Sequence, residues 1–147
     1  MNEAAKSYWD EYWQDGEKPV HFSAWMFGVS PDELAQLVIE GKKTATCSGH
    51  VFYEIENEPL PMVGEYSIVL NSKEQPVAMI KIVEVSIVPM NEVTEEFAVA
   101  EGEGPYEAWK SAHEEFFTSE LQTVGLEFSD DMLLVCERFT LIDVKDS

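Results

Sequence analysis

A long run of β-branched and apolar residues, from Val77 to Val88, is the feature that most constrains the fold of this chain. Such a run favours a strand, because branched side chains pack well on a pleated surface. A second stretch of alternating polarity, from Glu65 to Leu70, precedes it, and only the polar segment from Asn71 to Gln75 separates the two. A short polar loop between two strand patterns predicts an antiparallel hairpin.

The N-terminal segment has a different, helical pattern. Four aromatic residues lie at helical spacing before Gly16 and Pro19, which end the expected helix: Tyr8, Trp9, Tyr12 and Trp13. We interpret residues 1–20 as an aromatic helical extension packed on a domain that spans residues 21–147. The alternatives are an aromatic lid over a pocket and a contact between the two chains of a homodimer.

A second helix is expected before the first strands. Ser30 is placed as an N-cap, Pro31 at the first helical position, and Glu33 as the partner of a capping box. Gly41 is placed as the residue that stops this helix. Its buried stripe is expected to consist of Leu34, Leu37 and Val38.

The second half of the chain mixes strand and helix patterns. A short helix is expected after Pro89, with Val93 and Phe97 buried, and a longer one from about Pro105 to Gly125. The apolar stripe of the longer helix is expected to contain Trp109, Ala112, His113, Phe116, Phe117 and Leu121. Strands are expected at residues 44–47 and 132–144, the latter as one strand or two. Helices inserted among strands without regular alternation predict an α+β fold around a small curved sheet or barrel.

Composition limits both the architecture and the partners. A chain of 147 residues with 45% hydrophobic residues is long enough for one domain with its own core. Its formal net charge is −20, with only nine lysines and arginines. Such a charge repels a phosphate backbone, so we do not expect binding to long duplex nucleic acid. A small ligand, or a short single-stranded segment that reaches one positive pocket, remains compatible with it.

The sequence indicates no membrane association. No hydrophobic run approaches the roughly 20 residues of a membrane span, and the N-terminus lacks the pattern of a signal peptide. Cys47 and Cys136 are far apart in the sequence and are interpreted as reduced thiols. We therefore expect a cytoplasmic protein.

The segment Gly41-Lys42-Lys43-Thr44-Ala45-Thr46 is a local exception to the acidic background, at a helix-to-strand junction. A lysine near a hydroxyl can bind an anion or can help to activate the hydroxyl as a nucleophile. The segment matches the Gly-x-Lys-x-x-Thr signature of the ASCH domain family. The resemblance extends over residues 22–144 and includes the hairpin from Val63-Gly64 to Val77-Ala78 and a second block: Phe97-Ala98, Glu101-Gly102-Glu103-Gly104, Trp109, His113 and Phe116-Phe117.

The resemblance implies a PUA-like β-barrel with flanking helices and an RNA-linked role. One compact branch of the family hydrolyses acetylated cytidine with a lysine, a threonine and a glutamate. Transferred by motif position, the three catalytic residues are Lys43, Thr46 and Glu101, with Glu103 as the rival carboxylate. Other members are ribonucleases, for which a manganese ion is the implied cofactor. No cofactor is expected otherwise.

One position departs from the family pattern. Many members have an arginine two residues after the motif threonine, where this chain has Ser48. A serine cannot grip a phosphate in the bidentate manner of arginine. The only arginine, Arg138, is expected to pair with an acidic neighbour. The predicted ligand is therefore small and nucleoside-like, or a short RNA element, and the residues expected to line its pocket are Lys42, Ser48, Trp25, Phe27, Tyr53 and Glu103.

Three functional hypotheses follow from these observations. The first is a protein that binds a nucleoside, a nucleotide or a short RNA. The second is a hydrolase of the same fold, either an amidohydrolase on an acylated nucleoside or a ribonuclease. The third is a protein-interaction module. His113 is interpreted as a hydrogen-bonded core residue of its helix. The alternative is a metal site built from His113 with Glu101 or Glu103, which nothing in the spacing requires.

Overall fold

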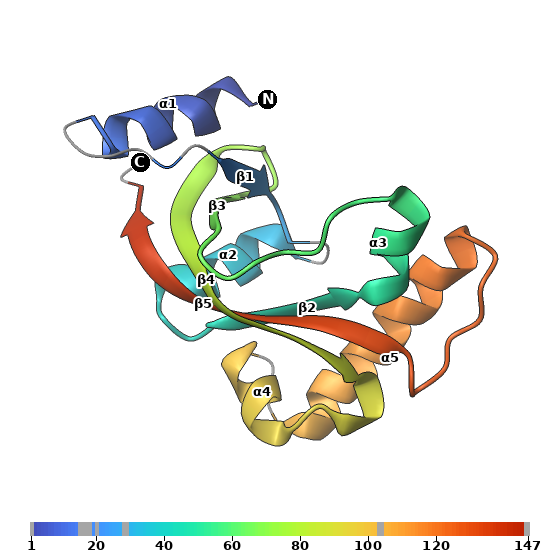
Figure 1. The fold of residues 1–147 in the computed structure, drawn as a ribbon. Helices are drawn as coiled ribbons and strands as arrows, with labels where there is room; N and C mark the ends of the chain where they lie inside the picture. Colours follow the sequence, from blue (N-terminus) through green and yellow to red (C-terminus); the bar gives the residue numbers. More distant parts are fainter. Residues whose placement is uncertain (1, 15–18, 20, 28–29, 103–104, 146–147) are drawn as a thin grey trace. The chain divides into compact units, whose positions relative to one another are not determined.

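In the computed structural model, the predicted hairpin joins β3 (Tyr66–Leu70) to β4 (Pro76–Pro89) (Figure 1). The two strands pair antiparallel, with Ser67 opposite Ile80. The side chain of Asn71 closes the turn by accepting hydrogen bonds from the backbone N–H groups of Lys73 and Gln75, at 2.9 and 3.0 Å. Asparagine is favoured in turns for this reason.

The structure describes residues 2–14, 19, 21–27, 30–102 and 105–145. The chain divides into two compact units. The first unit contains residues 1–44, 62–84 and 139–147, and the second contains residues 45–61 and 85–138. The two long strands, β4 and β5 (Leu133–Val144), contribute residues to both units.

The strands form one mixed five-stranded sheet in the order β1-β3-β4-β5-β2. β1 (Phe22–Trp25) pairs parallel with β3, whereas β2 (Ala45–Gly49) pairs antiparallel with β5. The α+β class is therefore confirmed, and the C-terminal segment is a single strand. β1 and β2 are the edge strands of this order, so the sheet is open and the closed barrel implied by the resemblance is not confirmed.

In the first unit, α1 (Glu3–Tyr12) contributes to a core cluster with the hairpin. Tyr8 and Trp9 are buried in this cluster, which also contains Ile68, Leu70 and Met79. Asn2 caps the helix by accepting a hydrogen bond from the backbone N–H of Ala5 at 3.1 Å. The tyrosine hydroxyl of Tyr8 donates to Asp143 on β5 at 2.8 Å, which ties the helix to the C-terminal strand.

α2 (Pro31–Ile39) packs in a second cluster of the first unit through Ala35 and Val38. Leu34 and Leu37, predicted to be buried, are only partly buried. The predicted capping box is wrong, because Ser30 is left-handed (φ 46°) and its side chain makes no capping bond. The glycine stop is confirmed: Gly41 has φ +77°, and the backbone N–H of Lys42 donates to the carbonyl of Leu37 at 2.9 Å.

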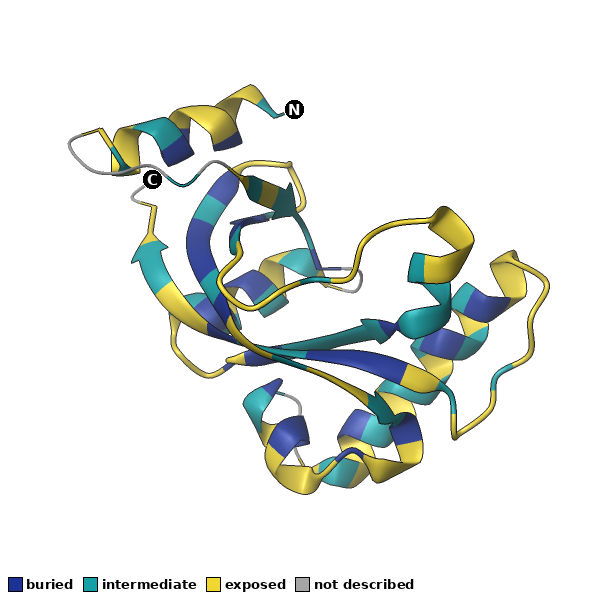
Figure 2. Ribbon diagram, in the orientation of Figure 1, coloured by how far each residue is buried: buried dark blue, intermediate teal, exposed yellow. Residues whose placement is uncertain are grey.

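The second unit contains the helices α3 (His50–Glu56), α4 (Glu95–Ala100) and α5 (Tyr106–Thr123), and the 3-10 turn η1 (Met90–Glu92). α3 was not predicted. The predicted burial of Val93 and Phe97 is confirmed. Figure 2 shows a buried stripe along α5, which comprises Trp109, Phe117 and Leu121. Ala112, predicted within this stripe, is exposed, and His113 is only partly buried.

The core of the second unit is formed by η1, α4, α5, β2 and the part of β5 that belongs to this unit. Phe97 and Ala98 of α4 pack with Trp109 and Phe117 of α5 and with Cys136 of β5. Within the described residues, no helix is both long enough and apolar enough to cross a membrane.

Candidate functional site

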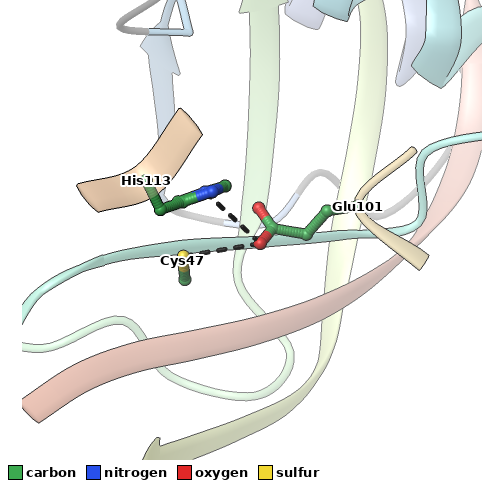
Figure 3. Close-up of side chains that lie close together, drawn as sticks. All are labelled: Cys47, Glu101 and His113. Atoms are coloured by element: carbon green, nitrogen blue, oxygen red, sulfur yellow. Dashed lines mark hydrogen bonds and ion pairs between the residues drawn. The ribbon is translucent and has the colours of Figure 1, made fainter. Parts of the chain in front are cut away.

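The carboxylate of Glu101 is the centre of a polar cluster inside the second unit (Figure 3). The indole Nε1 of Trp109 donates a hydrogen bond to Glu101 Oε2. The Sγ atom of Cys47 lies 3.5 Å from the same oxygen, and Nε2 of His113 lies 3.6 Å from it. We call these four residues the Glu101 cluster. Glu101 is only 2% exposed, so its charge is compensated by protein groups rather than by bulk water.

Glu101 reaches this position because it is the C-cap residue of α4, directly after Ala100. Its backbone N–H still donates to the carbonyl of Phe97 at 3.0 Å, and the next residue, Gly102, has φ +83°. A left-handed glycine after the last turn ends a helix without the steric cost that a side chain would bring. The helix end therefore directs the Glu101 side chain toward Trp109 of α5.

Trp109 and His113 lie one turn apart on α5, and their rings stack with centroids 4.3 Å apart. Nδ1 of His113 lies 2.8 Å from the backbone carbonyl of Trp109. A carbonyl only accepts, so Nδ1 carries a hydrogen. In the neutral imidazole, Nε2 then presents its lone pair toward Glu101, whereas the protonated ring forms an ion pair with it.

Cys47 enters the cluster from β2, where it lies directly opposite Cys136 of β5. Neither thiol takes part in a disulfide bond. Burial, followed by the nearby negative charge of Glu101, raises the pKa of the Cys136 thiol to about 12. The separation of the two cysteines in the sequence does not predict that they lie opposite each other. Their proximity depends on the register between β2 and β5.

Successive residues of a strand point to opposite faces, so Thr46 and Ser48 face away from the side of β2 that carries Cys47. Thr46 pairs with Glu137 in the β2–β5 register. The Ser48 hydroxyl lies 2.9 Å from the Tyr53 hydroxyl of α3. Burial raises the pKa of Tyr53, so its phenol stays protonated. We call Thr46, Ser48 and Tyr53, all partly buried, the hydroxyl face.

Lys43, by contrast, belongs to the first unit. Its side chain is only 2% exposed, and its Nζ atom lies 5.2 Å from the ring centroid of Phe27, in a cation–π contact. Trp25 packs edge-on against Phe27, with centroids 5.0 Å apart. Lys42 is exposed and forms an ion pair with Glu40 at 3.3 Å.

A sequence model of the ASCH domain matches residues 23–143 of the chain. The chain belongs to the ASCH domain family. Two solved structures support this assignment over almost the whole length. An ASCH domain from Lactobacillus crispatus JV V101 has 34% sequence identity and a TM-score of 0.90, and the match covers 96% of this chain and 95% of that one.

A protein from Enterococcus faecalis V583 has 38% identity and a TM-score of 0.88, with 98% of this chain and 91% of that chain covered. No functionally curated protein shows significant similarity to the chain. The family is therefore established, and the two structures support the α+β fold described above.

The predicted site residues of this ASCH domain fall into separate groups. Ser48 contacts Tyr53, and Lys43 contacts Phe27. Glu101 contacts Cys47 and His113. Neither is among the predicted site residues, although His113 with Glu101 was the alternative metal site. Glu103 lies outside the described residues. The expected pairing of Arg138 is confirmed, because its guanidinium donates to both carboxylate oxygens of Glu96, at 2.9 and 2.7 Å.

Proposed function

We propose that this ASCH domain binds a small nucleoside-like ligand or a short single-stranded RNA element at the hydroxyl face. The observation that carries the proposal is the placement of Thr46 and Ser48 on one side of β2, with Tyr53 hydrogen-bonded to Ser48. Hydroxyl groups both donate and accept, which suits the mixed edges of a nucleobase and a ribose. A tyrosine ring can also support a base by stacking, typically for about 1–3 kcal/mol per base.

Charge favours a small ligand over a long one. The chain carries a formal net charge of −20, and Ser48 occupies the position where many family members have an arginine. Neither feature attracts several phosphates at once. The proposed ligand is therefore a nucleoside, a nucleotide or a short RNA, and not a duplex.

The motif lysine is the second part of the proposal. Lys43 stands three residues before Thr46 in the sequence, and its ammonium group is almost completely buried. Burying a charged group costs free energy. Proteins therefore bury such groups mainly where a function requires them, and they are common at functional sites. Lys42 was predicted from the sequence to line the pocket as well, but its side chain is exposed and pairs with Glu40. The proposal therefore assigns the role to Lys43 alone, with the adjacent Lys42 as its comparison.

The test measures ligand binding by calorimetry and by thermal shift, with cytidine, acetylated cytidine and a short single-stranded RNA. We expect Lys43→Ala, Thr46→Val and Tyr53→Phe each to weaken binding at least about tenfold, the effect of losing one charged or buried hydrogen bond. Lys42→Ala and the exposed Thr44→Val serve as matched controls and should bind like the wild type. Equal binding by all five variants, or no binding by the wild type, contradicts the proposal.

Hydrolysis of an acylated nucleoside is the second candidate. The buried carboxylate of Glu101 favours it, whereas the placement of Thr46 on the opposite face of β2 from Cys47, which Glu101 contacts, counts against it. The catalytic set implied by the resemblance is Lys43, Thr46 and Glu101. Release of acetate from acetylated cytidine, lost in Thr46→Val and in Glu101→Gln, would support an amidohydrolase. Binding without turnover supports the binding protein proposed first. The ribonuclease and the protein-interaction module remain predictions from the sequence alone.

A further inference from the structure

We propose that Cys47, Glu101 and His113 form a site for one thiophilic divalent cation, with zinc as the preferred ion. The inference does not depend on the proposed ligand, because Cys47 lies on the opposite side of β2 from Thr46 and Ser48. All three residues belong to the second unit. Each supplies a different donor type: a thiolate, a carboxylate and an imidazole nitrogen.

The distances between the donor atoms suit a tetrahedral ion. Zinc binds sulfur at about 2.3 Å and nitrogen or oxygen at about 2.0–2.1 Å, so neighbouring tetrahedral ligands lie about 3.3–3.6 Å apart. In the structure, Sγ of Cys47 and Nε2 of His113 lie 3.5 and 3.6 Å from Oε2 of Glu101. All three donor atoms lie within 4.8 Å of one another, so a small rotation about the side-chain bonds completes the triangle.

Hydrogen bonds from neighbouring groups orient two of the three donors, as they commonly do for metal ligands in proteins. Nδ1 of His113 donates to the carbonyl of Trp109 at 2.8 Å, which leaves the lone pair of Nε2 for the ion in the neutral ring. Trp109 Nε1 donates to the carboxylate of Glu101. Hydrogen bonds of this kind fix the tautomer of a histidine ligand and the direction of a carboxylate ligand.

The donor set selects the type of ion. A thiolate and an imidazole favour zinc or cobalt, whereas magnesium and calcium prefer oxygen ligands alone. The two negative ligands neutralise the charge of the divalent ion, which matters because Glu101 is almost completely buried. On binding, Cys47 loses its thiol proton to solvent, and no electron is transferred. Three protein ligands leave a fourth position open for water, as in catalytic zinc sites.

The same side chains can also form a metal-free network. In that arrangement the thiol, the indole and a protonated imidazole all donate to Glu101, and no cation is needed. The two arrangements differ in one measurable respect, because only the first places a thiolate on a metal. The experiment is designed around this difference.

The test titrates cobalt(II) into the full chain without a histidine tag, under a non-thiol reductant. We expect one cobalt per chain and a thiolate-to-cobalt charge-transfer band, which one equivalent of zinc abolishes and excess magnesium does not. Zinc should also slow the alkylation of Cys47 at least about tenfold. Wild-type protein that shows no charge-transfer band, or only weak binding of several ions, overturns the proposal in favour of the metal-free network.

Substitution of each proposed ligand tests whether that side chain binds the metal ion. Cys47→Ser should remove the charge-transfer band, and His113→Gln and Glu101→Gln should each weaken cobalt binding at least about tenfold. Cys136→Ser and His50→Gln are the matched controls, because Cys136 is the paired thiol on β5 and His50 contacts Glu54 outside the cluster. Both controls should bind cobalt like the wild type. A band that survives in Cys47→Ser and disappears in Cys136→Ser would also refute the proposed site.

Discussion

Cys47 and Cys136 have the same chemistry but different surroundings. They face each other across β2 and β5, yet Cys136 is only 4% exposed and Cys47 is partly exposed, beside Glu101. Burial penalises a thiolate, so the pKa of Cys136 rises from 9.0 to about 12. Of the two thiols, Cys47 is therefore the one suited to reagents and to a metal.

The raised pKa of Cys136 predicts a specific loss of stability in alkali. The folded thiol stays protonated up to about pH 12, whereas the unfolded thiol ionises from about pH 9. The stabilisation it contributes is complete below pH 9 and is lost between pH 9 and about 12. Urea unfolding at pH 8, 9 and 10 should show a steeper decline for the wild type than for Cys136→Ala.

Cys47→Ala is the control for that experiment, because it also removes a thiol from the same pair of strands. Its decline with pH should follow that of the wild type. Parallel declines for the wild type and Cys136→Ala would mean that the Cys136 thiol does not titrate differently in the folded and unfolded states.

At the scale of elements, α1 shows how an aromatic helix divides between core and surface. Trp9 is 2% exposed and stacks on Phe22 of β1, with ring centroids 4.7 Å apart, whereas Tyr12 on the same helix is 41% exposed. The helix thus contributes core side chains to the first unit. The boundary predicted between an extension of residues 1–20 and a domain of residues 21–147 stays a prediction.

This division predicts unequal effects of two aromatic substitutions. Trp9→Ala should lower the free energy of unfolding by about 3–5 kcal/mol, the usual cost of removing a large buried ring. Tyr12→Ala on the exposed side should cost about 1 kcal/mol or less. Urea unfolding followed by circular dichroism measures both values. Similar losses for the two variants would contradict the packing of α1 on the hairpin.

Local sequence patterns predicted most elements but not all of them. The hairpin and α5 have long, periodic patterns, and β3, β4 and α5 appear within one or two residues of their expected bounds. α3 escaped prediction because it has seven residues, no side-chain cap and no buried residue. Ser30 was misassigned as a side-chain cap because residue type indicates a cap, whereas the backbone dihedral angles decide whether one forms.

At the scale of the whole molecule, net charge is the dominant feature. A formal charge of −20 on 147 residues means that acidic side chains repel one another throughout the folded chain. The charged pairs offset this only locally: Arg138 pairs with Glu96, whose pKa is lowered mainly by that hydrogen bond. Self-repulsion of this kind weakens the folded state more than the expanded unfolded state.

We therefore expect added salt to stabilise the protein. Raising sodium chloride from about 10 mM to about 150 mM shortens the screening length from about 30 to about 8 Å. The melting temperature should rise by several degrees, because this screening reduces the repulsion among the acidic groups. Differential scanning calorimetry at constant pH measures the shift, with sucrose at matched osmolarity as the uncharged control. A melting temperature that stays constant with salt would show that the repulsion is already offset within the fold.

Local patterns in the amino-acid sequence are sufficient to predict the α+β class, the hairpin, the long helix α5 and the ASCH motif around Lys43 and Thr46. These features depend on local periodicity, turn chemistry and short spacing, all of which can be read within a few residues. The sequence also identified Glu101 as a candidate carboxylate, although only through the resemblance.

The set of side chains around Glu101, by contrast, depends on contacts between residues that are far apart in the sequence. Cys47 lies 54 residues before Glu101, and it joins the cluster because the β2–β5 register turns its thiol toward α4 and α5. The same register turns Thr46 to the opposite face, so adjacent residues of β2 lie on different surfaces. Strand register and the packing of helices on a sheet arise from long-range contacts, and no local pattern in the sequence encodes them.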